Sequence, residues 1–102
     1  MESITVIRGE LRYCSVNLDE IDGDATPTSG PAVEIVNRRG RGDLSDELLS
    51  SEPAHAPALV GSAVAFWVDA RAYTRVTHCI VRASATLDSG EVAVGEVALL
   101  IQ

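Results

Sequence analysis

Two histidines and two cysteines are the residues of this chain whose side chains most often take part in catalysis or metal binding. His55 lies between prolines and His78 on the polar side of an alternating stretch, and neither has a cysteine or second histidine at zinc-site spacing. A nucleophile–base pair would need a serine, cysteine or lysine held beside a histidine, and no sequence signature indicates one. We therefore predict that both histidines are exposed to solvent, and that the chain is not an enzyme and uses no metal or cofactor.

The two cysteines, Cys14 and Cys79, both fall on the apolar faces of expected strands. We predict free, buried thiols that pack as small hydrophobic side chains, and a disulfide between two packed sheets is the alternative. The acidic start of the chain argues against a signal peptide, and no apolar run approaches the length of a membrane span. Together these features predict folding in a reducing cytoplasm.

Two short motifs are similar to ligand-binding segments. The acidic stretch from Asp19 to Asp24 contains a glycine, as calcium loops do, but it lacks the glutamate of their twelfth position, so a solvated loop is expected. Residues 41–43 spell Arg-Gly-Asp, a tripeptide that some cell-surface receptors bind. Because a match of three residues arises readily by chance, we interpret it as a flexible turn before a helix cap.

Charge and composition exclude several partners. The formal net charge of the 102 residues is −7, whereas binding to a phosphate backbone depends on Lys and Arg. We therefore expect neither nucleic acid nor an anionic membrane as a partner. Hydrophobic residues make up 46% of the chain, which is enough to form the core of one domain.

Alternating apolar and polar residues predict strands. From Thr77 to Leu87, apolar side chains fall on nearly every second position, which is the period of a half-buried strand. A turn at 88–90 and a second alternating run from Glu91 to Ile101 complete an expected hairpin. The other expected strands are residues 3–8, 11–18, 32–37 and 59–68.

Long loops separate some of these strands. Prolines and glycines exclude residues 19–31 from a sheet interior, and residues 38–57 form a second loop with one helical turn over 44–49, capped by Asp43. No helical crossovers are available to join parallel strands. We therefore predict a single all-β domain over residues 1–102, an antiparallel immunoglobulin-like β-sandwich of about seven strands.

The second loop is the first candidate for a protein interface. It contains a basic run and an apolar cluster, and we expect it to be mobile in the free chain and ordered against a neighbouring subunit. Trp67 is the second candidate: it either anchors the core or, if Phe66 faces the core instead, lies on an intersubunit surface. The predicted interface residues are Arg38, Arg39, Arg41, Leu44, Leu48, Leu49 and Trp67.

The C-terminal third of the chain resembles a known family. It contains a Trp strand (64–69), a short turn with Tyr73-Thr74, and a strand at 81–91 that includes Thr86-Leu87-Asp88-Ser89-Gly90. This pattern is similar to that of small virion proteins of tailed bacteriophages, often called fibre–tail adaptors or minor structural proteins. The resemblance implies an immunoglobulin-like sandwich that joins fibres or neighbouring proteins to the tail or capsid.

The resulting expectation is a structural virion protein, made in the cytoplasm of a host bacterium, that assembles in several copies with tail, fibre, portal or capsid proteins. A tail adaptor is preferred, and a capsid decoration protein is the alternative. A carbohydrate-binding accessory sandwich is a further alternative; it would need exposed aromatic residues on one face, and the chain has only four aromatic residues.

Overall fold

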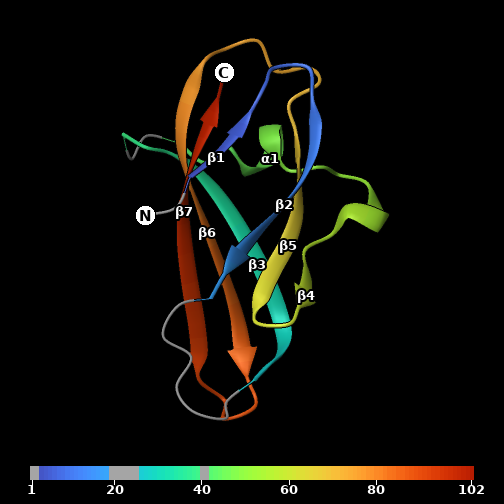
Figure 1. The fold of residues 1–102 in the computed structure, drawn as a ribbon, viewed down its shortest axis with the longest axis vertical. Coiled ribbons are helices and arrows are strands. Elements are labelled where there is room, and N and C mark those ends of the chain that lie inside the picture. The colour runs from blue at the N-terminus through green and yellow to red at the C-terminus, as the bar shows by residue number, and fades with distance from the viewer. Residues whose placement is uncertain (1–2, 19–25, 40–41) are drawn as a thin grey trace.

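The computed structural model describes residues 3–18, 26–39 and 42–102. Seven strands form two sheets that pack face to face, one in the order β1-β7-β6-β3 and the other in the order β2-β5-β4 (Figure 1). The fold is an all-β sandwich, as predicted. Its elements are β1 (Ser3–Val6), β2 (Leu11–Asn17), β3 (Pro27–Asn37), α1 (Ser45–Leu48), the 3-10 turn η1 (Pro53–His55), β4 (Ala58–Val60), β5 (Ala63–Asp69), β6 (Thr77–Leu87) and β7 (Val92–Ile101).

The hairpin of β6 and β7 forms the centre of the larger sheet. The two strands are antiparallel from Thr77 opposite Ile101 to Thr86 opposite Val92. The alternate residues of β6 from Cys79 to Leu87 are buried, as the sequence pattern predicts. β1 lies on the other side of β7 and is the one parallel partner among the described strands. The strand pairing is that of an immunoglobulin-type sandwich: one sheet contains β2, β5 and β4, and the other contains β3, β6 and β7.

Strand β3 begins earlier than expected. Residues 27–31 were predicted to belong to a loop, but β3 starts at Pro27, and that part of the prediction is wrong. The strand lies at the edge of its sheet, where a proline needs no ladder hydrogen bond, and its register with β6 shifts twice before Ala32. Gly30 takes a φ of 64° in this irregular stretch. Of the rest of the expected loop, Thr26 belongs to no strand and residues 19–25 lie outside the described residues.

A tight turn divides the strand expected at residues 59–68. β4 and β5 are two antiparallel strands joined at Gly61, which has a φ of 59°. The expected alternation along β5 is confirmed, because Val64, Phe66 and Val68 are all buried.

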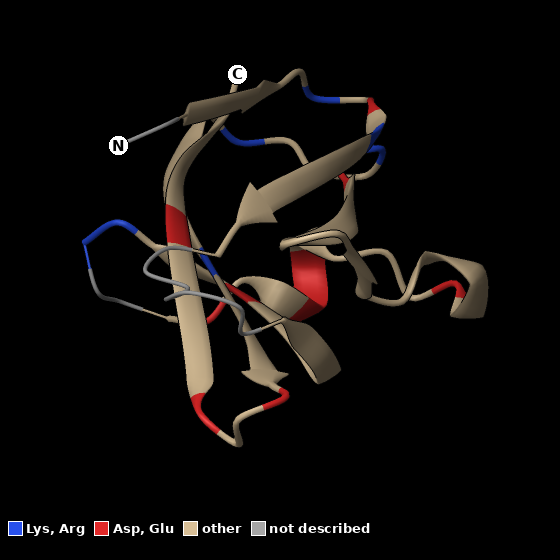
Figure 2. Ribbon diagram, turned by 60° about the horizontal axis from the view of Figure 1, so that its bottom comes forward, with Lys and Arg blue, Asp and Glu red and all other residues tan. Residues whose placement is uncertain are grey.

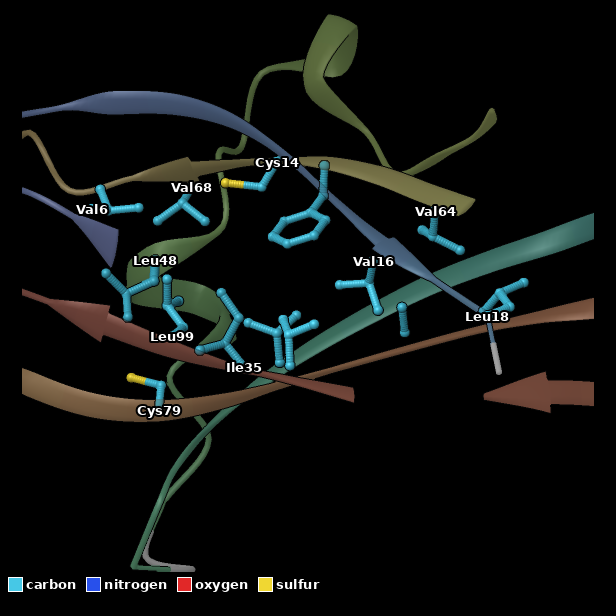
Figure 3. Close-up of a cluster of buried hydrophobic side chains, with 14 of the residues drawn as sticks. Val6, Cys14, Val16, Leu18, Ile35, Leu48, Val64, Val68, Cys79 and Leu99 are labelled. Carbon is cyan, nitrogen blue, oxygen red and sulfur yellow. The ribbon is translucent and has the colours of Figure 1, made fainter. Parts of the chain in front are cut away.

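The core lies between the two sheets and contains side chains from both (Figure 3). Phe66 is its only aromatic residue with full burial, and most other members are valine, leucine, isoleucine or alanine. Cys14 and Cys79 are buried there as free thiols, as predicted. Burial raises the pKa of each thiol to about 11. No buried polar or charged residue occurs within the described part of the chain.

The short helix α1 closes one side of the sandwich. Its N-cap residue is Leu44 rather than Asp43, although the Asp43 carboxylate accepts a hydrogen bond of 2.8 Å from the Ser45 N–H. The Leu44 N–H donates to the Ile35 carbonyl, and the Ile35 N–H donates to the Ser45 hydroxyl. The start of the helix therefore covers part of the β3 edge. No described helix has the length and apolar character needed to cross a lipid bilayer.

Candidate functional site

Trp67 lies on the outer face of the smaller sheet. Side chains alternate along β5, and because Phe66 is buried in the core with 1% of its surface exposed, Trp67 points the opposite way. The first interpretation of Trp67, as a core anchor, is therefore wrong, and the expected orientation of the alternative, with Phe66 facing the core and Trp67 facing outward, is confirmed. Tyr13 of β2 is directly opposite Trp67 in the register, with ring centroids 5.2 Å apart and planes inclined at 59°.

His55 completes the cluster by covering one face of the tryptophan. Its ring stacks on Trp67 with centroids 4.3 Å apart and planes within 19° of each other. The His55 side chain is only 15% exposed, so the prediction of a solvent-exposed histidine is wrong for this residue. The prediction is confirmed for His78, which is exposed on the outer face of the larger sheet. Tyr13, Trp67 and His55 are called the aromatic cluster below.

Backbone and side-chain contacts fix the segment that carries His55. Leu49 forms a bridge with Val68, and the N–H of Ser50 donates to the carbonyl of Trp67 at 3.1 Å. The Ser50 hydroxyl then lies 2.8 Å from Nδ1 of His55. The segment from Leu49 to His55 is therefore attached to β5 at its start and held to Ser50 at its end. This leaves the His55 ring little freedom to move away from Trp67.

A charged network borders the aromatic cluster. Arg71 donates two hydrogen bonds to the Asp69 carboxylate, at 3.0 and 2.9 Å, and lies 3.8 Å from Glu52. Glu52 also lies 3.4 Å from Nδ1 of His55. The hydrogen bonds from Arg71 lower the pKa of the Asp69 carboxyl, and those same bonds raise the pKa of Arg71. This edge of the site is polar and its charges are paired.

The neighbouring serine, histidine and glutamate have the residue types of a hydrolytic triad but a different geometry. In a triad the nucleophile contacts one ring nitrogen of the histidine and the acid contacts the other. Here Ser50 and Glu52 both approach Nδ1 of His55. We interpret them as groups that orient the ring. This Ser–His pair is not predicted from the sequence, because the one local pattern there is Pro53, which begins a short turn and says nothing of a serine and histidine in contact.

The sheet beside the aromatic cluster has small side chains. Ala65 lies between Ser15 and Ala58 in one cross-strand row, and Ala63 lies between Asn17 and Val60 in the next. Among them the small residues Ser15, Ala58 and Ala63 form a low surface next to the large rings, whereas Ala65 is itself covered, with 3% of its surface exposed. Tyr13 (55% exposed) and Val60 rise above it as exposed hydrophobic side chains.

The structure separates the predicted interface residues. Leu48 is fully buried, and Leu44 and Leu49 pack against the core, so the expectation that this apolar cluster packs against a neighbouring subunit is wrong. These leucines close the sandwich of their own chain. Arg38 and Arg39 are exposed after β3, on the larger sheet, and do not join Trp67 on the smaller one. Arg41 lies outside the described residues, as does the acidic stretch from Asp19 to Asp24.

No group of three or more potential metal ligands occurs among the residues that the structure describes. Neither family models, nor curated proteins, nor solved structures match this chain.

Proposed function

We propose that this chain is a structural binding module that attaches to a partner protein through the aromatic cluster. The observation that carries the proposal is the placement of Trp67 and Tyr13 together on the outer face of the sheet, where the core does not need them. Tryptophan and tyrosine are enriched among the residues that dominate protein interfaces. The adjoining row of small residues leaves room for a partner to approach the rings.

Preorganisation supports the same proposal. The hydrogen bond between the Ser50 hydroxyl and Nδ1 of His55 holds the histidine, and the stacked His55 ring holds Trp67 in one orientation before any partner arrives. Fewer side-chain rotamers then have to be fixed on binding, which reduces the entropic cost of the interface. The paired charges of Arg71, Asp69 and Glu52 supply a polar rim beside an apolar centre, as in many interfaces.

The specific form that we propose is a virion protein of a tailed bacteriophage, an adaptor that links fibres or neighbouring proteins to the tail and is present in several copies. Its support is the resemblance of the C-terminal third to such adaptors, together with the all-β sandwich. A capsid decoration protein would use the same kind of domain. Symmetry separates the two, because an adaptor follows the low-order rings of a tail and a decoration protein follows the capsid lattice.

Carbohydrate binding is a second candidate, favoured by one observation. Sugars stack on exposed aromatic faces, and Tyr13 offers such a face on the outer sheet. Trp67 suits this purpose less well, because His55 already occupies one face of its ring. Protein binding requires no free ring face and is therefore preferred.

The test begins with particles produced from the genome that encodes this chain. We expect the chain to co-purify with them, and image reconstruction to place the outer face of the β2-β5-β4 sheet against another virion protein. A Trp67→Ala variant should fold but be lost from the particles. An Ile7→Ser variant, which changes an exposed hydrophobic residue away from the cluster, is the matched control and should be retained.

Other outcomes would reject parts of the proposal. Retention of Trp67→Ala at the wild-type level would exclude the aromatic cluster as the attachment surface. Absence of the wild-type chain from particles, with specific binding of the isolated chain on a glycan array, would favour the carbohydrate-binding alternative. Neighbouring reading frames without portal, capsid or tail genes would reject the phage assignment.

A further inference from the structure

One end of the larger sheet carries a basic pocket on this acidic protein. The pocket has a volume of about 700 Å³ and is open to solvent. Among its lining residues are Arg38, Arg39, Arg75 and His78, and Val76 lies between them. Within the described residues Arg38 and Arg39 have no ion-pair partner, whereas Arg75 contacts Glu47 at 3.1 Å. The pocket therefore offers two unpaired guanidinium groups, which suit carboxylates.

The turn between β6 and β7 has the opposite character. Asp88 and Glu91 are both exposed, and Figure 2 shows red segments and no blue segment on this turn. Among the described residues, their side chains accept hydrogen bonds only from uncharged groups, namely the Thr26 N–H to Asp88 and the Ser89 hydroxyl to Glu91. Val92 follows at once. The turn is therefore a narrow acidic tip with a valine beside it.

The acidic tip and the basic pocket also resemble each other in that each carries an exposed valine. Val92, at 64%, and Val76, at 58%, are the two most exposed large hydrophobic side chains of the described residues. One belongs to the acidic tip and the other lines the basic pocket. Contact between the tip and a pocket would cover both valines while it brings carboxylates to guanidinium groups.

A chain cannot make this contact with itself. Strand β6 begins at Thr77, which lines the pocket, and ends at Leu87, next to the tip. Its 11 residues separate the two regions by about 35 Å at the rise of an extended strand. The tip of one chain can therefore reach only the pocket of another.

We propose that copies of this chain associate head to tail, with the tip at residues 88–92 of one copy seated in the Arg38/Arg39/Arg75 pocket of the next. Such a contact joins two different surfaces, so it builds a ring if the rotation closes and a filament if it does not. This inference deepens the multi-copy assembly of the proposed function, but it uses a different surface. The head-to-tail contact can be disproved while partner binding through Trp67 is confirmed, and partner binding can be disproved while the head-to-tail contact is confirmed.

Sedimentation equilibrium of the full chain tests the contact. We expect the average mass to rise above 10.8 kDa with concentration at about 0.1 M salt and to fall again at about 1 M salt. The lower salt is chosen because a Debye length of about 10 Å screens the overall −7 charge while leaving contacting charges effective. The variant Trp67→Ala should associate as the wild type does.

Charge reversal makes the test specific. Arg38→Glu with Arg39→Glu makes the pocket acidic, and Asp88→Arg with Glu91→Arg makes the tip basic. Each double variant alone should associate at least about tenfold more weakly, since like charges then meet. An equimolar mixture of the two should associate again, because every contact between one variant and the other pairs opposite charges, although contacts between two copies of the same variant do not.

The control changes two arginines elsewhere, Arg12→Glu with Arg82→Glu, and has the same net charge as the pocket variant. It should associate as the wild type does, apart from a general effect of charge, and thermal unfolding should show that all variants are folded. A wild type that stays at 10.8 kDa at every concentration would overturn the proposal. So would a mixture that fails to associate, or a control that weakens association as much as the pocket variant.

Discussion

Phe66 and Trp67 are adjacent in the chain but lie on opposite faces of β5, one inside the sandwich and one outside. Phe66 is almost fully buried among core side chains, whereas Trp67 lies under the stacked ring of His55. Of two neighbouring aromatic residues, one therefore belongs to the core and the other to the outer surface. Substitutions at the two positions should separate these roles.

Truncation of the two aromatic residues should affect stability unequally. Phe66→Ala removes a buried ring and should lower the free energy of unfolding by about 3–5 kcal/mol. Trp67→Ala removes outer-face contacts and should lower it by about 1–2 kcal/mol, because solvent already reaches part of the ring. Urea denaturation followed by circular dichroism measures both changes. Equal losses would mean that Trp67 contributes to the fold as much as Phe66 does.

Removal of the stacked histidine should be visible in the fluorescence of Trp67, the only tryptophan of the chain. His55→Ala exposes the ring face that His55 now covers, so the emission should shift to longer wavelength and acrylamide should quench it more strongly. The loss of stability should stay below about 1.5 kcal/mol. His78→Ala, on the other sheet, is the control and should leave the spectrum unchanged. An unaltered spectrum in His55→Ala would show that the stacked arrangement is not populated in solution.

The sequence predicted the sandwich well because its strands are buried on one face only. The alternation in β6 from Cys79 to Leu87 follows directly from that one-sided burial. Alternation also placed Phe66 and Trp67 on opposite faces. It could not decide which face was inside, since small alanines flank the tryptophan and could pack in a core as well as on a surface.

Sequence patterns could not predict the features that depend on contacts between distant segments. The burial of Leu48 requires the two sheets to leave a gap that α1 fills. The stacking of His55 joins residues from two separate elements, η1 and β5. Likewise, the start of β3 at Pro27 is possible only because this strand lies at an edge. Of the three residues of the aromatic cluster, only Trp67 was therefore predicted as an interface residue from the sequence.

Gly95 should tolerate no side chain. A β-carbon at this position of β7 would overlap the backbone carbonyl of Asn17, because β2 passes close to the larger sheet there. Gly95→Ala should therefore cost roughly 2–4 kcal/mol of unfolding free energy, as overpacking of a rigid site does. Gly61→Ala is the comparison, because its β-carbon would meet open space and the cost is only the left-handed backbone strain of about 1 kcal/mol. A similar melting temperature for both variants would contradict the close approach of the sheets.

Two neighbouring substitutions test the register of β6. Val81 is fully buried, so Val81→Asp places an unpaired charge between the sheets and should prevent folding. Arg82 faces solvent, in register with Glu34 on one side and Glu96 on the other. Arg82→Asp should therefore fold but lose about 1 kcal/mol, because three carboxylates then lie side by side. Circular dichroism and thermal melting distinguish the outcomes, and identical melting of both variants would show a different register.

The buried thiols should make the protein less stable in alkali. Burial raises the pKa of Cys14 and of Cys79 from 9.0 to about 11. The unfolded chain thus loses these protons at lower pH than the folded chain does. The stabilising contribution is complete below about pH 9 and decreases as the pH rises towards 11, by on the order of 1–3 kcal/mol for each thiol.

Comparison with Cys14→Ala/Cys79→Ala isolates this effect, because the double variant keeps every other titrating group. The difference in unfolding free energy between wild type and variant, from urea titrations at pH 8, 9, 10 and 11, should decrease steadily above pH 9. Folded wild-type protein should also react slowly with a thiol reagent at pH 8, since the reactive thiolate is scarce, and should show two free thiols once denatured without reductant. A difference that stays constant through pH 11 would mean that the thiols reach solvent in the folded protein, and that Cys14 and Cys79 do not lie within the packed core.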